Sequence, residues 1–170
     1  GNVINWYENT DGHGNFTLKQ SMYAFKANMV MAADMDNDND LDLVWSANGE
    51  GDIKWLRNDG AGVFGTTFNI EINTSRVAGI FPADINGDGA LDVVSGFGID
   101  GGGQGVVWYK NNNNGTGSFA SMSLISNAVN YVNSVYAGDI DGDGDVDVVS
   151  ASATDGKIAW YANTNGLGAF

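Results

Sequence analysis

Several residue types are scarce or missing in this chain of 170 residues. It has no cysteine, which excludes disulfide bonds and thiolate metal sites. Its one histidine, His13, has no second histidine to complete a zinc site or a catalytic triad within the chain, and we expect a plain surface residue. No apolar run approaches the roughly 18 residues of a membrane span, so membrane insertion is not expected.

Positive charge is also scarce. Seven Lys and Arg stand against 21 Asp and Glu, which gives a formal net charge of −14. Such a surface repels nucleic acid and anionic lipid, so neither is an expected partner. No acid–base or nucleophile constellation appears either, which argues against an enzyme.

An unusual acidic string is present three times. Residues 34–42 read DMDNDNDLD, residues 84–92 read DINGDGALD and residues 139–147 read DIDGDGDVD. These strings hold 13 of the 21 acids, and each runs into an apolar segment. A tryptophan segment recurs at a similar period, with Trp6, Trp55, Trp108 and Trp160. Periods near 50 residues are typical of propellers, solenoids and arrays.

The repeat predicts four strands per unit and essentially no helix. The first strand precedes the acidic string (27–33, 77–83, 132–138), and the second follows it (41–46, 91–96, 146–151). The third holds the tryptophan (3–8, 53–58, 106–111, 158–163), and the fourth follows a Gly/Asn-rich turn (16–23, 67–72, 119–126). The only proline, Pro82, falls in a first strand, which places that strand at a sheet edge because proline cannot donate to the ladder.

These units predict an all-β fold, a β-propeller-like array of four-stranded antiparallel blades. The array has about three blades plus a half-blade: 1–24 (third and fourth strands only), 25–75, 76–127, and 128–170, which lacks most of its last strand. We expect the tryptophans and their apolar partners two residues earlier to fill the gaps between blades. A sugar-stacking platform is the less favoured alternative, because a tryptophan at one register of every repeat is typical of core.

Each acidic string has the composition of a cation loop. Ca²⁺ takes 6–8 oxygen ligands, and side chains at positions 1, 3 and 5 of a tight loop can converge on one ion. We expect further ligands from the backbone carbonyl at position 7 and the aspartate at position 9. The predicted ligands are Asp34, Asp36, Asp38, Asp40 and Asp42; Asp84, Asn86, Asp88, Ala90 and Asp92; and Asp139, Asp141, Asp143, Asp145 and Asp147. An EF-hand would need Glu at position 12, where Trp45, Ser95 and Ser150 stand instead.

Charge supports the same interpretation. Carboxylates about 5 Å apart repel by roughly 1–3 kcal/mol at effective dielectric constants of 80 to 20, and a divalent ion reverses that sign. We expect about three Ca²⁺ ions acting as structural staples. The alternatives are an ion-free solvated turn, and Mg²⁺, which prefers fewer protein ligands.

The three strings, each followed by apolar residues, resemble FG-GAP/VCBS repeats, the blades of integrin-α-type propellers. Val63-Phe64-Gly65 is similar to the Phe-Gly of that family. Ser46-Ala47-Asn48, Ser95-Gly96-Phe97 and Ser150-Ala151-Ser152 stand where Gly-Ala-Pro would be, as in microbial relatives. The resemblance implies Ca²⁺ in each loop, an extracellular setting, and a role in adhesion or glycan binding.

Two functions follow as hypotheses. The first is a calcium-binding extracellular module that binds a protein or carbohydrate ligand. The second is a structural protein that self-associates head to tail into filaments. The chain begins with Gly1, which we interpret as a processed or excised segment, part of an oligomer or a longer array. Asn15, Asn73 and Asn114 lie in N-glycosylation sequons whose number is that expected by chance.

Overall fold

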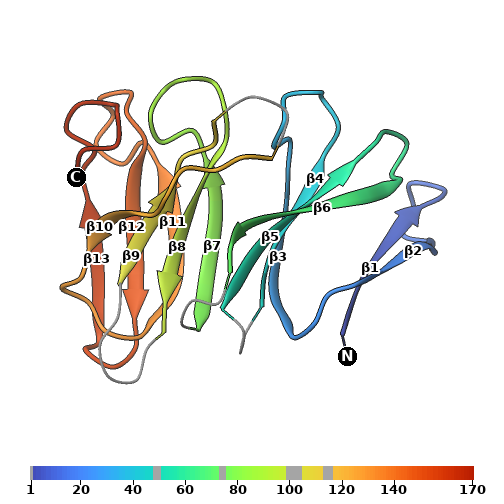
Figure 1. Cartoon of the computed structure of the whole chain (residues 1–170), viewed down its shortest axis with the longest axis horizontal. Coiled ribbons are helices and arrows are strands. Elements are labelled where there is room, and N and C mark those ends of the chain that lie inside the picture. The colour runs from blue at the N-terminus through green and yellow to red at the C-terminus, as the bar shows by residue number, and fades with distance from the viewer. Residues whose placement is uncertain (1, 48–50, 73–75, 99–104, 113–116) are drawn as a thin grey trace.

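The computed structural model describes residues 2–47, 51–72, 76–98, 105–112 and 117–170. These residues form strands and turns and contain no helix, and therefore no helix long and apolar enough to cross a membrane. The strands make four antiparallel sheets that stand side by side along the molecule (Figure 1). The all-β, blade-like prediction is therefore confirmed, and the described sheets do not close into a ring.

The sheets follow the chain in order. The first is a hairpin of β1 (Val3–Asn9) and β2 (Phe16–Tyr23). The second, sheet B, has the order β3 (Ala27–Ala33), β4 (Asp42–Ala47), β5 (Asp52–Asn58) and β6 (Phe64–Glu71). The third, sheet C, holds β7 (Val77–Ala83), β8 (Asp92–Phe97), β9 (Val106–Tyr109) and β10 (Ser123–Ser126). The last, sheet E, holds β11 (Val132–Gly138), β12 (Asp147–Ser152) and β13 (Lys157–Tyr161).

The expected fourth strand of sheet C differs from the structure. A strand over 119–126 was expected, but β10 covers only Ser123–Ser126, and Phe119 forms a separate single bridge with Asn111. Phe119 and Met122 pack against the core instead of continuing the ladder. Pro82 lies in β7 at the edge of its sheet, as expected for a residue without a backbone N–H.

The hydrophobic core lies between sheets, because each sheet is apolar on the faces it turns to its neighbours. One cluster joins sheets B and C through residues such as Trp55 and Ile80, and a second joins sheets C and E through Trp108 and Val135. The central strand β8 is buried along its whole length, as its largely apolar sequence predicts. The hairpin contacts sheet B through a smaller cluster around Trp45.

Glycines in two of the tight turns, Gly62 and Gly168, each meet a tryptophan from the preceding sheet. A Cβ on Gly62 would lie 2.4 Å from the Trp6 ring, and one on Gly168 would lie 2.5 Å from the Trp108 ring. The Trp6 indole N–H also donates to the Gly62 carbonyl at 3.0 Å. The predicted gap-filling role therefore holds for Trp6, Trp55 and Trp108, whereas Trp160 is 50% exposed.

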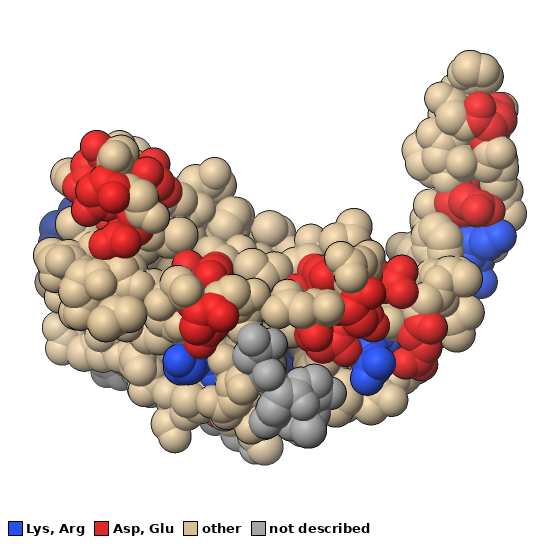
Figure 2. All heavy atoms as spheres, turned by 90° about the horizontal axis from the view of Figure 1, so that it is seen from above, with Lys and Arg blue, Asp and Glu red and all other residues tan. Residues whose placement is uncertain are grey.

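The stacked sheets form an arc, and the hairpin is its projecting arm (Figure 2). The turns β3–β4, β7–β8 and β11–β12 all emerge on one edge of the arc (Figure 1). They correspond to the three acidic strings, which we call loop 1 (34–42), loop 2 (84–92) and loop 3 (139–147). Their carboxylates appear as separate patches along that edge (Figure 2).

Candidate metal loops and a candidate ligand groove

The first aspartate of each loop organises the loop backbone. In loop 1 the Asp34 carboxylate accepts hydrogen bonds from the backbone N–H groups of Asp38 at 3.1 Å and Asn39 at 2.9 Å. The Asp38 carboxylate accepts one from the N–H of Asp40 at 2.9 Å. The same three bonds recur in loop 2 at Asp84 and Asp88; in loop 3 Asp143 accepts the N–H of Asp145, and Asp139 accepts those of Gly142 and Gly144. These bonds curl the backbone into a tight turn.

Two positions of each loop have a left-handed backbone. Position 6 has φ values of 71° at Asn39, 86° at Gly89 and 94° at Gly144, as the sequence predicts. Position 4 is also left-handed, with φ 60° at Asn37 and 82° at Gly142. The sequence prediction missed position 4, although Asn and Gly at 37, 87 and 142 carried the signal.

The aspartate at position 9 is the buried hub of each loop. One Asp42 oxygen accepts the N–H of Met35 at 3.0 Å, and the other accepts the N–H of Asn58 at 2.8 Å. Asp92 and Asp147 repeat this pair of bonds, with Ile85 and Asn111 and with Ile140 and Asn163. Each carboxylate therefore ties its loop to the end of the tryptophan strand.

The carboxylates that converge are those at positions 1, 3 and 9. Ligand atoms of Asp34, Asp36 and Asp42 lie within 4.8 Å of one another, and so do those of Asp139, Asp141 and Asp147. Position 5, which was expected to join this set, does not lie within it among the described residues. In loop 2 the third position is Asn86, whose amide N–H donates to Asp92 at 3.0 Å.

Loop 1 carries an unsatisfied oxygen that fits a cation. The Asp36 side chain is 4% exposed, and its Oδ1 is buried without a hydrogen-bond partner. A buried carboxylate oxygen without a donor is costly, and it lies in a cluster of three carboxylates. A hard divalent ion with oxygen ligands would satisfy all three, so the residues present fit Ca²⁺.

Burial and like charge change the acidity of the loop residues. Burial raises the pKa of Asp92 to about 6 and also raises the pKa of Asp42. Burial, followed by the charge of Asp38, raises the pKa of Asp36. Burial alone would raise the pKa of Asp147 too, but the N–H groups of Asn163 and Ile140 outweigh it and the pKa is lowered.

The asparagines that follow the last two tryptophan strands, Asn111 and Asn163, join neighbouring sheets, a feature that the sequence prediction missed. The Asn111 side-chain amide donates to the Leu91 carbonyl at 3.0 Å in its own blade and to the Met35 carbonyl at 2.8 Å in loop 1. Asn163 likewise donates to Val146 at 3.2 Å and to Ile85 of loop 2 at 2.9 Å. The recurring "N" of WYEN, WLRN, WYKN and WYAN carried the signal.

The remaining predicted site residues lie at the surface or outside the described chain. His13 and Asn15 are exposed in the hairpin turn. Asn73 and Asn114 fall outside the described residues. At position 7, Ala90 is buried whereas Asp40 and Asp145 are half-buried.

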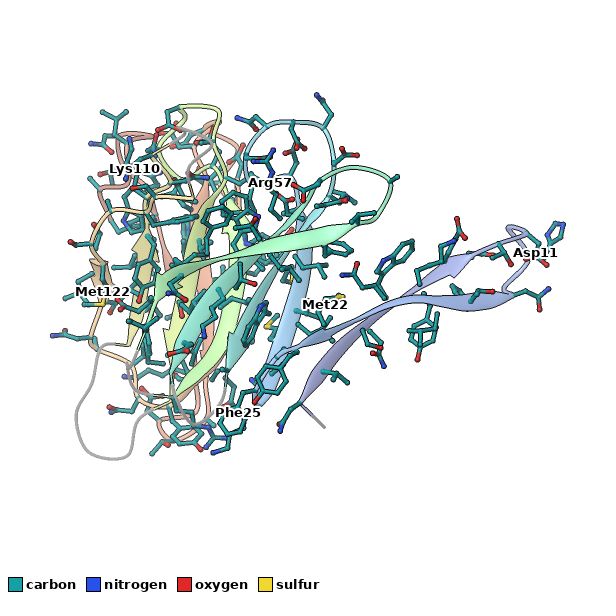
Figure 3. All side chains as sticks on the ribbon, turned by 45° about the vertical axis from the view of Figure 1, so that its right-hand side comes forward. Asp11, Met22, Phe25, Arg57, Lys110 and Met122 are labelled. Atoms are coloured by element: carbon teal, nitrogen blue, oxygen red, sulfur yellow. The ribbon has the colours of Figure 1, made fainter. Side chains whose placement is uncertain are left out.

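A separate groove lies where the hairpin meets sheet B. It has a volume of about 340 Å³ and is lined by Tyr23, Phe25, Trp45, Lys54 and Thr67. The Lys54 ammonium lies 5.5 Å from the centre of the Trp45 ring and 2.8 Å from the Asp52 carboxylate. Phe25 lies at the junction of the hairpin and the sheet (Figure 3). The groove therefore joins aromatic surface to a fixed pair of charges.

Comparison with known proteins places this fold in a family. Residues 34–95 and 84–150 match the model of the FG-GAP-like repeat. The chain belongs to the FG-GAP-like repeat family, as its motifs indicated.

A solved structure described as the basis of specific recognition of non-reducing terminal N-acetylglucosamine by an Agrocybe aegerita lectin has the same fold. Its TM-score is 0.61 at 23% sequence identity, over 96% of this chain and 47% of that chain. The chain thus spans about half the length of that lectin. No curated protein sequence matches the chain.

Proposed function

We propose that this chain is a non-catalytic, calcium-stabilised extracellular repeat module that binds a carbohydrate ligand. The groove of Tyr23, Phe25, Trp45, Lys54 and Thr67 is the observation that carries this proposal. Sugars have apolar faces that pack on aromatic rings and hydroxyls that need polar partners, and the groove offers both. The fold shared with an N-acetylglucosamine-binding lectin supports the same ligand class.

The groove is specific to one blade. Trp45 occupies the strand position that Ser95 and Ser150 occupy in the next two repeats. Tyr23 is 74% exposed and belongs to the hairpin, so two elements together form the binding surface. A protein ligand with an exposed polar loop is the other ligand class that such a groove accepts.

Calcium has a structural part in this proposal. Bound Ca²⁺ supplies positive charge that neutralises the crowded carboxylates of each loop. The residues that would hold it are the converging Asp34, Asp36 and Asp42 in loop 1, and Asp139, Asp141 and Asp147 in loop 3. In loop 2, Asp84, Asn86 and Asp92 occupy the same positions. The predicted ligands at positions 5 and 7 complete the proposed set.

Saccharide titration tests the ligand. A glycan array followed by NMR titration with N-acetylglucosamine should perturb the amides around Tyr23 and Trp45. Tyr23→Ala should weaken binding roughly two- to tenfold, because an aromatic contact contributes about 0.5–1.5 kcal/mol. Tyr7→Ala is the matched control, since Tyr7 is also an exposed hairpin tyrosine but does not line the groove. Absence of saccharide binding at millimolar concentration, or equal losses in all variants, would overturn the assignment.

Head-to-tail self-association into filaments is a second candidate, and an exposed face supports it. Ile158 and Trp160 on β13 are 83% and 50% exposed, whereas Trp55 and Trp108 are buried beneath the next sheet. The hairpin turn around Gly14 has the left-handed backbone of the Gly168 turn, which covers Trp108, but a Cβ added at Gly14 would meet nothing within 4 Å. In a head-to-tail contact this turn would cover Trp160 of a second copy. Light scattering across protein concentrations tests this: growth that Ile158→Asp abolishes favours association, and a constant monomer mass contradicts it.

A further inference from the structure

In the first two loop-bearing blades, the residue two positions after the tryptophan contacts the acidic loop of its own blade. In the three loop-bearing blades the residue at this position is Arg57, Lys110 and Ala162. The strand before it and the asparagine after it are equivalent in all three blades. The three blades therefore differ in the charge of the side chain at this position, while the neighbouring residues are equivalent.

In the first two blades the side chain is a cation in contact with the loop. Arg57 Nε lies 3.3 Å from Asp36 Oδ2, and its Nη2 lies 3.8 Å from Asp38. Lys110 Nζ lies 2.9 Å from Asp88 Oδ2. Figure 3 shows Arg57 and Lys110 at the loop-bearing edge of the sheets. Both cations sit on residues at loop positions 3 or 5.

Loop 3 has no such cation. Among the described residues, no lysine or arginine forms an ion pair with any carboxylate of residues 139–147; the nearest basic residue in sequence, Lys157, pairs with Asp155 instead. Loop 3 nevertheless has five aspartates, as loop 1 does, whereas loop 2 has three. Its negative charge is the least compensated of the three.

We propose that Arg57 and Lys110 are tethered counter-cations that grade the calcium affinity of the loops, with loop 3 tightest, loop 1 intermediate and loop 2 weakest. This inference rests on the proposed binding of calcium. Arg57 pairs with Oδ2 of Asp36, but the buried Oδ1 of the same carboxylate has no hydrogen-bond partner. The tethered cation therefore does not itself satisfy the carboxylate cluster of loop 1. A small divalent ion still has a place there.

The physical reason is competition between positive charges. A divalent ion entering loop 1 or loop 2 meets a monovalent cation a few ångströms away, and repulsion between them at solvent-like dielectric constants corresponds to about a tenfold loss of affinity or more. Because Arg57 and Lys110 are 35% and 43% exposed, salt screens this repulsion, and the spread between loops should narrow as ionic strength rises. Without calcium, the same two cations partly neutralise the carboxylates of loops 1 and 2, whereas loop 3 has no such cation.

Calcium titration of the full chain, followed by NMR at the position-6 amides of Asn39, Gly89 and Gly144, tests the order. Lys110→Ala makes blade 2 equivalent to blade 3 at this position and should tighten loop 2 about tenfold. Ala162→Lys should weaken loop 3 by a similar factor. Lys19→Ala is the control, since Lys19 pairs with Glu8 on the hairpin and its loss changes net charge equally.

The outcomes separate the two proposals. Saturation in the order 3, 1, 2, with Lys110→Ala tightening loop 2 and Lys19→Ala leaving it unchanged, supports the inference. Equal affinities at the three loops, or the same shift in Lys110→Ala and Lys19→Ala, overturn it while leaving calcium binding intact. Absence of calcium binding at every loop overturns the proposed function as well. Lys110→Gln replaces Lys110→Ala if the alanine variant unfolds, with the same expected result.

Discussion

At the residue scale, the position-9 aspartate does more than offer a metal ligand. Asp42, Asp92 and Asp147 are buried, and both oxygens of each already accept backbone N–H groups. Each residue therefore fixes the loop backbone before any ion binds. Asp92 Oδ2 also accepts the Asn86 amide, whereas the Asp42 oxygens each keep a lone pair for a cation.

The raised pKa of Asp92 makes stability without calcium depend on pH. Its pKa rises from 3.8 to about 6 on folding because of burial, so the folded chain holds the proton more tightly than the unfolded chain. In calcium-free buffer the resulting stabilisation is present at low pH and is lost as pH rises from about 4 through about 6. Denaturant unfolding at several pH values should show this decline, and Asp92→Asn should reduce it. An unchanged decline in Asp92→Asn would assign it to other groups.

The inter-blade asparagine predicts a second residue-scale effect. Asn163→Ala removes the amide that bonds the buried Ile85 carbonyl in the neighbouring loop, which should lower the free energy of unfolding by about 1–3 kcal/mol. Asn112→Ala is the matched control, because the Asn112 amide is exposed and donates to the Ser118 hydroxyl of its own blade at 3.0 Å. Denaturant unfolding measures both, and equal losses would contradict an inter-blade role.

At the scale of elements, the turn that follows a tryptophan strand can cover the tryptophan of the preceding sheet, as the Gly62 and Gly168 turns do. Gly168 and Gly14 occupy the same turn position, with φ values of 86° and 96°. Of these two turns, only the Gly168 turn lies against a tryptophan.

This pair separates packing from backbone strain. Gly14→Ala should cost about 1–2 kcal/mol for its left-handed backbone alone. Gly168→Ala should cost about 1–3 kcal/mol more, because the new methyl would overlap the Trp108 ring. Thermal unfolding of the two variants measures the difference. Equal losses would mean that the turn moves away from the tryptophan at no cost.

The elements also mark what sequence patterns could predict. The tryptophan period, the largely apolar segments such as β8 and the acidic strings located the strands and the loop edge. Pattern alone could not shorten β10, because the inward packing of Phe119 and Met122 is a tertiary effect. It also could not show that the carboxylates at positions 1, 3 and 9 are the ones that lie within 4.8 Å of one another in loops 1 and 3.

At the scale of the whole molecule, stability depends on interfaces between successive sheets. The tryptophans at 6, 55 and 108 each meet a neighbouring sheet, and the loops contact one another, as where the Asn37 amide donates to the Gly89 carbonyl at 3.0 Å. A loop that loses order should therefore weaken the adjoining blade. The repeat period predicts stacked blades, but it does not predict this contact, which spans two repeats.

Calcium removal tests the coupling across the whole chain. If each loop is loaded at about 100 times its dissociation constant, each ion stabilises the fold by about 2.7 kcal/mol. Chelation should then lower the melting temperature by about 5–10 °C per site. Asp141→Ala should reproduce the loss at loop 3 alone. A melting curve unchanged by chelator would contradict the structural role of the ion.

The placement of all three loops on one edge makes the molecule electrically lopsided. Three divalent ions would cancel six of the 14 net negative charges, and all of that change would fall along this single rim. Calcium loading would thus reduce the molecular dipole as well as the total charge. The protein should migrate more slowly toward the anode when loaded, and should turn the acidic rim toward a cationic surface when ion-free.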